Sequence, residues 1–147
     1  MKAKDLMIGD WVQGNPCGQC CDRNNNTYYK IATLDIVDHC WGYSSCGAIV
    51  ELKYDDISSI PLTPEILEKN GFLANKHIYP YPYYEYEVKE IKVRVGFAFP
   101  QGNRTSYKEP WVCIDTECVY IEHLPCIFVH QLQQVLRLCG IEKEIEL

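Results

Sequence analysis

The stretch IPLTPEILEKNGF, residues 60 to 72, encodes a short helix in the middle of the chain. Thr63 is a favourable N-cap because its side-chain oxygen can accept a hydrogen bond from the first helical turn. Pro64 suits the first helical position, where its missing N–H leaves no bond unmade, and Glu65 complements the positive end of the helix dipole. We therefore predict that a helix begins at Thr63.

The end of the same stretch predicts where this helix stops. Asn70 and Gly71 both tolerate the left-handed conformation that commonly ends a helix, so the predicted helix covers only residues 63–70. Such a short helix is expected to link two larger structures. We predict two units, residues 1–62 and 63–147.

The N-terminal half is predicted to be a small β unit. Residues 28–37 (YYKIATLDIV) are rich in β-forming side chains, but their apolar alternation slips phase, which predicts a bulge near residues 32–33. After a turn predicted at 39–47, residues 48–54 alternate as a strand with one buried face, and a further short strand fits 57–60. Four or five short antiparallel strands predict an SH3-like small β barrel or a meander.

The C-terminal half is predicted to be an antiparallel sheet with one packed helix. Residues 84–99 alternate as β structure, with a change of register at 89–90 that requires a bulge or a tight bend. Residues 111–121 return as an antiparallel strand, and apolar side chains at helical spacing predict a helix at about 125–139. The alternating tail, 141–147, fits either an edge strand or a frayed end. The whole chain is thus predicted to be an α+β protein.

Composition and charge exclude several classes of protein. The chain is 47% hydrophobic and 23% charged, as folded proteins are, and its apolar runs fall far short of the roughly 18 residues of a membrane helix. A net charge of −6 without a cluster of lysines and arginines disfavours nucleic-acid binding. Nine cysteines, an odd number, and an N-terminus without a secretory pattern predict reduced thiols and a cytoplasmic location.

Three strings resemble a family of small uncharacterised proteins from gut Bacteroidetes. They are MKAKDLMIGDWV at residues 1–12, IPLTPEILEKNGF at 60–72 and VHQLQQVLRLCGI at 129–141. These strings specify caps, helix faces and strand entries, and they contain no nucleophile beside a base. Members of that family are similar to cargo genes of prophages and other mobile elements. The resemblance implies an accessory role without an assigned activity.

The candidate metal or redox site is a cysteine-rich loop with Cys17, Cys20 and Cys21. Thiolates separated by two intervening residues, as at Cys17 and Cys20, can supply half of a tetrahedral zinc site or carry thiol redox chemistry. A second group consists of His39, Cys40 and Cys46. If residues 28–38 form one extended strand at about 3.3 Å per residue, the two groups lie roughly 35 Å apart and do not form one site. Incidental buried cysteines are the competing interpretation, and no cofactor is predicted.

The candidate partner-binding surface is the tyrosine-rich segment HIYPYPYYEYE at residues 77–87. Its candidate contact residues are Tyr79, Tyr81 and Tyr83, because tyrosine rings combine a large apolar area with a polar tip. The competing interpretation is that these rings pack within the protein while their hydroxyl groups stay in water.

Three functional hypotheses remain. The first is a non-catalytic accessory or protein-interaction module of a phage or mobile element, with a protein partner or self-association. The second is a metal-binding or thiol-redox protein that uses Cys17, Cys20 and Cys21, and the third is an enzyme with a site at the seam between the halves. The sequence favours a non-catalytic role over an enzyme, because it contains no recognisable triad or acid–base pair. His130 and Gln134, one helical turn apart, are interpreted as a solvent-facing pair.

Overall fold

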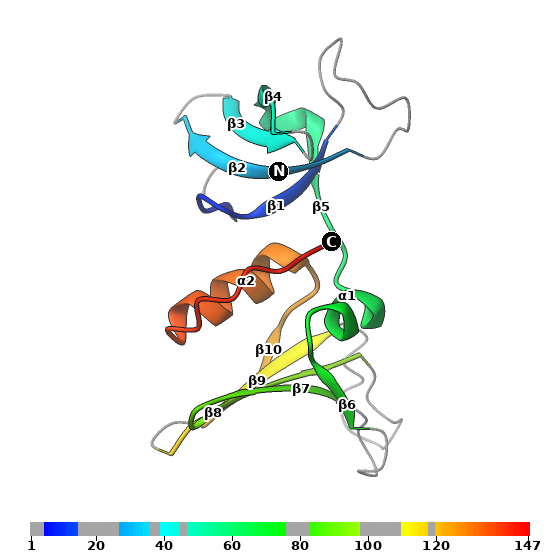
Figure 1. The fold of residues 1–147 in the computed structure, drawn as a ribbon, viewed down its shortest axis with the longest axis vertical. Coiled ribbons are helices and arrows are strands. Elements are labelled where there is room, and N and C mark those ends of the chain that lie inside the picture. The colour runs from blue at the N-terminus through cyan, green and yellow to red at the C-terminus, as the bar shows by residue number, and fades with distance from the viewer. Residues whose placement is uncertain are drawn as a thin grey trace. The chain divides into compact units, whose positions relative to one another are not determined.

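A computed structural model describes residues 5–14, 27–35, 39–44, 47–75, 83–97, 110–117 and 120–147, without the side chains of residues 27, 122 and 123. The chain divides into two compact units, Met1–Ile60 (unit 1) and Pro61–Leu147 (unit 2). Each unit is built on one antiparallel sheet, and unit 2 adds the main helix (Figure 1). The protein therefore belongs to the α+β class.

Unit 1 is a five-stranded sheet with the strand order β4-β3-β2-β1-β5. Its elements are β1 (Trp11–Gly14), β2 (Thr27–Leu34), β3 (His39–Ser44), β4 (Ile49–Lys53), the 3₁₀ turn η2 (Tyr54–Asp56) and β5 (Ile57–Ser59). Among the described residues, no pairing joins the two outer strands, β4 and β5, so the sheet is open. A closed SH3-like barrel is therefore not confirmed.

Two sequence predictions for unit 1 meet different outcomes. The predicted bulge is confirmed, because the register between β2 and β3 shifts between Ile31 and Thr33. The predicted turn at 39–47 is wrong, because His39–Ser44 forms β3, the strand between β2 and β4. The inward positions of β3 hold the small residues Cys40, Gly42 and Ser44, which weakens the apolar alternation of the strand.

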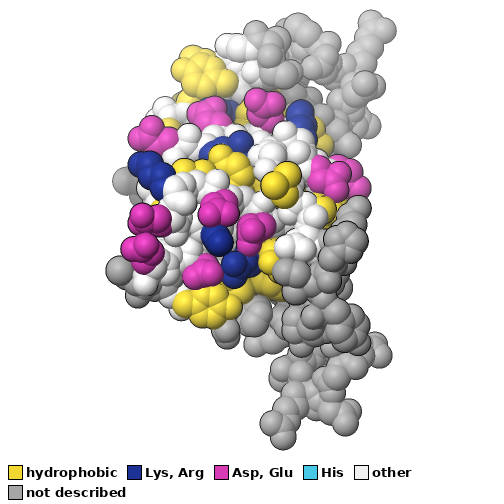
Figure 2. Space-filling model, turned by 60° about the horizontal axis from the view of Figure 1, so that its bottom comes forward, with side chains coloured by type: hydrophobic (Ala, Val, Ile, Leu, Met, Phe, Trp, Pro, Cys, Tyr) yellow, Lys and Arg dark blue, Asp and Glu magenta, His cyan; other side chains and the backbone are white. Residues whose placement is uncertain are grey.

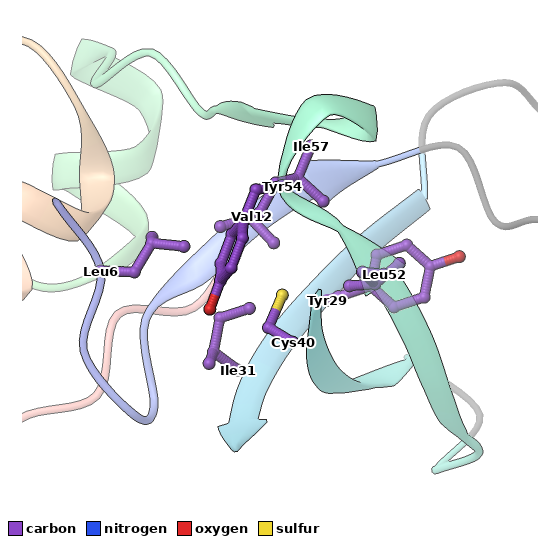
Figure 3. Close-up of a cluster of buried hydrophobic side chains, with 8 residues drawn as sticks. All are labelled: Leu6, Val12, Tyr29, Ile31, Cys40, Leu52, Tyr54 and Ile57. Carbon is purple, nitrogen blue, oxygen red and sulfur yellow. The ribbon is translucent and has the colours of Figure 1, made fainter. Parts of the chain in front are cut away.

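The core of unit 1 draws one or two side chains from each strand. Its buried members are Leu6, Val12, Tyr29, Ile31, Cys40, Leu52, Tyr54 and Ile57 (Figure 3). Burial of these apolar side chains is the main force that holds such short strands together, because each strand alone is too short to be stable. One face of the sheet is thus committed to packing.

Unit 2 has a second five-stranded sheet, with the order β10-β9-β8-β7-β6. Its elements are α1 (Pro64–Lys69), β6 (Leu73–Asn75), β7 (Tyr83–Val88), β8 (Ile91–Gly96), β9 (Trp111–Asp115), β10 (Tyr120–Pro125) and α2 (Val129–Leu138). The predicted stretch 84–99 is two strands, because Lys89 adopts a φ of 55° in a tight turn between them. β9 pairs antiparallel with β8, as predicted.

The signals at the ends of α1 are confirmed in detail. The Thr63 hydroxyl oxygen accepts a hydrogen bond from the N–H of Ile66 at 3.4 Å. Gly71 has a φ of 75°, and the N–H of Phe72 then donates to the carbonyl of Leu67 at 3.0 Å. Phe72 therefore folds back against the helix.

The C-terminal helix and tail depart from the prediction in two ways. The helix begins at Val129 and not near 125, because Pro125 is the last residue of β10. The tail is neither a strand nor frayed. Asn70 fixes it with two hydrogen bonds, from the N–H of Glu146 to Asn70 Oδ1 and from Asn70 Nδ2 to the carbonyl of Glu146, both at 2.8 Å, and Ile145 is buried.

No helix in the described part of the chain is long and apolar enough to cross a membrane.

Candidate functional site

The side chains of β3 alternate strictly between the two faces of the unit 1 sheet. Cys40 and Ser44 point toward the buried face, whereas His39, Trp41 and Tyr43 lie on the opposite, outward face. Of the outward three, Tyr43 is the most open, with 46% of its surface exposed. One strand therefore presents three ring-bearing side chains in a row, two residues apart.

Gly42 allows β3 to lie close against its neighbours. A Cβ atom at this position would come within 2.9 Å of the Tyr29 Cβ and 3.2 Å of the Leu52 Cδ1. Any larger residue would push β3 away from β2. The absence of a side chain at Gly42 therefore allows β3, with its outward row of rings, to lie close to β2 and β4.

β4 adds a second row on the same outward face. Ile49, Glu51 and Lys53 lie opposite Tyr43, Trp41 and His39, respectively. Ile49 is 61% exposed, although isoleucine is among the residue types most often buried. These six residues are called the β3–β4 face below.

A hollow of about 290 Å³ lies at one end of the β3–β4 face, lined by His39, Lys53, Tyr54 and Asp55. His39 and Lys53 are direct cross-strand partners, while Tyr54 and Asp55 open the η2 turn that follows β4. The hollow thus combines an imidazole and an ammonium group with one carboxylate.

Tyr54 lines this hollow and has a structural role. It is buried, and its hydroxyl group donates a hydrogen bond of 2.7 Å to the carbonyl of Asp35. Burial, and secondarily the nearby Cys40 thiol, raises the pKa of Tyr54 above its usual value. The phenol therefore stays neutral and ties η2 to the segment that leaves β2.

The other three side chains of the hollow are available to a ligand. In the part of the chain that the structure describes, those of His39, Lys53 and Asp55 form no hydrogen bond or ion pair. A general base is normally oriented by a third group, and here no carboxylate orients the imidazole. Two nitrogen-bearing groups side by side suit the binding of a carboxylate better than proton transfer.

The cysteines and histidines of the sequence hypotheses do not meet in a described site. Cys17, Cys20, Cys21 and Cys46 lie outside the described residues. Cys40 is buried on the opposite face of β3 from His39, and burial raises its pKa to about 11, so it is an inert thiol. Within the described ranges, no group of three or more His, Cys, Asp or Glu side chains could hold a metal ion.

The tyrosine candidates are also only partly described. Tyr79 and Tyr81 lie outside the described residues. Tyr83 opens β7, where its hydroxyl group accepts a hydrogen bond from Asn75 Nδ2 at 3.2 Å, and the guanidinium of Arg94 lies 5.6 Å from its ring centre. At Tyr83, the structure agrees with packing within the protein.

Arg94 itself is neutralised by its neighbours on the unit 2 sheet. Its Nε lies 2.6 Å from Glu85 and one terminal nitrogen lies 3.2 Å from Asp115. Figure 2 turns the side of unit 2 that lies lowest in Figure 1 toward the viewer and shows acidic and basic side chains interspersed on it. Because Arg94 is paired within the protein, it offers a ligand less than the hollow does.

His130 corrects the sequence interpretation of a solvent-facing pair. It is buried in the first turn of α2 and stacks on Phe128, with ring centres 5.7 Å apart. Gln134, one turn later, is only half-buried. His130 serves the fold of unit 2 because its ring packs flat against an apolar neighbour.

Sequence reasoning missed the hollow because it assigned β3 to a turn. The useful signal was the alternation of His39, Trp41 and Tyr43 with smaller residues, which indicates a strand with one outward aromatic row. Lys53 and Asp55 carry no local signal of their own. They join the site only through the pairing of β3 with β4 and through the η2 turn.

Comparison of the chain with protein-family models, with curated proteins and with solved structures gave no match.

Proposed function

We propose that the chain is a non-catalytic protein-interaction module whose unit 1 binds an extended peptide segment on the β3–β4 face. One observation carries this proposal: an outward row of rings, of which Tyr43 is exposed, and an exposed isoleucine lead directly to a polar hollow lined by His39 and Lys53. Exposed aromatic and aliphatic side chains beside convergent polar groups are the ordinary composition of a recognition surface.

The geometry of the row suits an extended chain. Rings two residues apart on one strand are spaced about 6.6 to 6.8 Å. An extended peptide that runs in the direction of this row places its own alternate side chains at the same interval. The hollow at the end of the row then provides room for a carboxylate from the ligand, next to the ammonium of Lys53.

The strand order supports a finer proposal about the fold of unit 1. Five short strands in the order β4-β3-β2-β1-β5, with a 3₁₀ turn before the last strand, follow the order of an SH3-like barrel. We propose that unit 1 is an open member of this architecture. Because such folds serve many unrelated functions, the fold supports peptide binding only by analogy.

Two further features fit an accessory module. Cys40, Cys113 and Cys126 are buried and not joined in disulfides, which fits a reducing compartment, and we place the protein in the cytoplasm. The resemblance of three sequence strings to mobile-element proteins agrees with an accessory role in such an element.

The test is a selection of random peptides on the full chain, followed by affinity measurements on variants. The double variant Tyr43→Ser with Lys53→Ala should bind the selected peptides about tenfold or more weakly, because it removes a ring of the row and a cation of the hollow. Tyr120→Ser is the matched control, since Tyr120 in unit 2 is also an exposed tyrosine, at 56%.

The control should bind as the unaltered protein does, and both proteins should keep the original melting temperature. Failure to enrich any peptide would contradict the proposal. Equal binding by the double variant would contradict it as well, because the ligand would then lie elsewhere.

A further inference from the structure

We propose that the bound peptide adds to unit 1 as a sixth strand, along the free edge of β4. This inference rests on the proposed function and specifies how the partner is held. In the described part of the chain, β4 pairs only with β3, so its other edge presents unpaired peptide groups. Such an edge is a template for another strand.

The hydrogen bonds around β3 show which peptide groups face that edge. The N–H of Ser44 donates to the carbonyl of Ala48 at 2.9 Å, one pair beyond Tyr43 and Ile49 in the same register. Hydrogen-bonded and non-bonded pairs alternate along an antiparallel ladder. Val50 therefore bonds to β3, and Ile49 turns its N–H and C=O outward.

By the same alternation, Leu52 bonds to β3 while Glu51 and Lys53 face the free edge. A hydrogen bond on the far side of β3 agrees with this phase. The N–H of Asp35 donates to the carbonyl of His39 at 3.0 Å. The backbone groups of His39 therefore face β2 and not its cross-strand partner Lys53. Three residues of β4 can thus bond an added strand through their backbone.

The side chains of the same three residues define the chemistry of the peptide. Ile49, Glu51 and Lys53 all lie on the β3–β4 face, so they stand beside alternate side chains of an added strand. Charge complementarity requires an acidic residue opposite Lys53 and a basic one opposite Glu51, and Ile49 favours an apolar residue. For an antiparallel strand, the order is acidic, any, basic, any, apolar.

The hollow adds to the preference for an acidic side chain at the first position of this pattern. The acidic side chain opposite Lys53 lies at the end of β4 where His39 and Lys53 line the hollow. It can therefore meet the ammonium directly and a second nitrogen-bearing group nearby. The peptide partner therefore carries an acidic, a basic and an apolar side chain, in this order, at alternate positions.

A second copy of this chain fits the edge less well. Paired antiparallel with itself, β4 can place Glu51 opposite Lys53 of the other copy twice. The same register sets Asp55 opposite Ile49, where the pattern requires an apolar side chain. A segment of another protein therefore matches the edge better than β4 itself.

The experiment compares two capped peptides, TETKTFT and its charge-reversed form TKTETFT, on the full chain. Binding is measured by titration, and amide hydrogen exchange of β4 is followed by NMR. TETKTFT should bind about tenfold more tightly. It should slow exchange at Ile49, Glu51 and Lys53, while Val50 and Leu52, which already bond to β3, change little.

Variants separate backbone from side-chain effects. Glu51→Pro removes one outward N–H without removing a bond to β3, and proline is tolerated on edges in this orientation. It should weaken binding by about tenfold relative to Glu51→Ala, which lacks the same carboxylate but keeps the N–H. The exchanged pair Glu51→Lys with Lys53→Glu should prefer TKTETFT.

Several results would overturn strand addition. These are equal binding of both peptides, no slowing at the three outward amides, or equal binding by Glu51→Pro and Glu51→Ala. Should Glu51→Pro fail to fold, the exchange data and the exchanged pair decide. Concentration-dependent protection of the same amides without peptide would assign the edge to a second copy and also overturn the proposal.

These outcomes remain distinct from failure of the proposed function. Peptides from the random selection can still depend on Tyr43 and Lys53 when TETKTFT shows none of the expected effects. In that case unit 1 is a peptide-binding module that uses its face and not its edge.

Discussion

At the scale of single residues, Gly96 shows how closely the strands of unit 2 approach a large side chain. A Cβ atom at this position would lie 2.2 to 2.7 Å from ring atoms of Trp111, the residue opposite it on β9. Trp111 is buried at 5% exposure, so its ring has little room to move away. Glycine is required here by the neighbouring ring and not by an unusual backbone angle.

Gly96→Ala should therefore lower the free energy of unfolding by about 1 to 3 kcal/mol, the usual cost of overpacking. Chemical denaturation measures this loss. The double variant with Trp111→Leu tests the cause, because a smaller side chain opposite residue 96 should make the added methyl group much less costly. If the double variant instead lost as much stability as the two single variants together, the clash would not be the reason.

The burial of the Cys126 thiol predicts that the protein loses stability in alkaline solution. Burial raises its pKa from 9.0 to about 12, because the thiolate is disfavoured away from water. The neutral thiol in the folded state therefore contributes fully below pH 9, and that contribution is lost as the pH rises from 9 toward 12.

Denaturation curves at pH 7 and pH 10.5 check this linkage. The unaltered protein should lose more stability between the two values than Cys126→Ala does, although the variant is less stable at pH 7 because of the cavity it leaves. Parallel losses in both proteins would remove Cys126 as a source of the pH dependence.

At the scale of elements, the tail of unit 2 depends on one amide side chain from the end of α1. Asn70 is buried, and besides its two hydrogen bonds to Glu146 it donates one of 2.8 Å to the carbonyl of Ile66. The amide offers the tail the same donor and acceptor pair that a neighbouring strand would offer. The tail is thus held without belonging to the sheet.

Asn70→Ala should lower the free energy of unfolding by about 1 to 3 kcal/mol, since it leaves buried backbone groups unpaired. It should also speed amide exchange at Glu146 before global unfolding. Asn75→Ala is the control, because in the described part of the chain its side chain bonds only to the Tyr83 hydroxyl group. Unchanged exchange at Glu146 in Asn70→Ala would contradict the account.

Elements with local signals could be predicted, and elements defined by distant partners could not. The cap at Thr63 and the stop at Gly71 act within a few residues, so the sequence of α1 was sufficient. β3 was missed because its inward side chains are small, and the fit at Gly42 depends on Tyr29 and Leu52 from other strands. The tail was missed for the same reason, since Asn70 lies far from it in the sequence.

At the scale of the whole molecule, the two units use their sheets differently. On the unit 2 sheet, Arg94 is paired with Glu85 and Asp115, so its charge is satisfied within the protein. On the unit 1 sheet, the described partners leave the side chains of His39 and Lys53 open beside an outward row of rings that ends in the exposed Tyr43. The sequence pointed to cysteines and tyrosines, whereas the described site arises from residues that only strand pairing brings together.

The β3–β4 face is, on this proposal, the binding surface of the protein. The most direct measurement is a ¹H–¹⁵N chemical-shift map of the full chain, titrated with a peptide from the random selection. We predict shifts concentrated in residues 39–44 and 49–55, with the amides around Arg94 unmoved. Shifts centred on Arg94, or an unchanged spectrum at saturating peptide, would contradict the account.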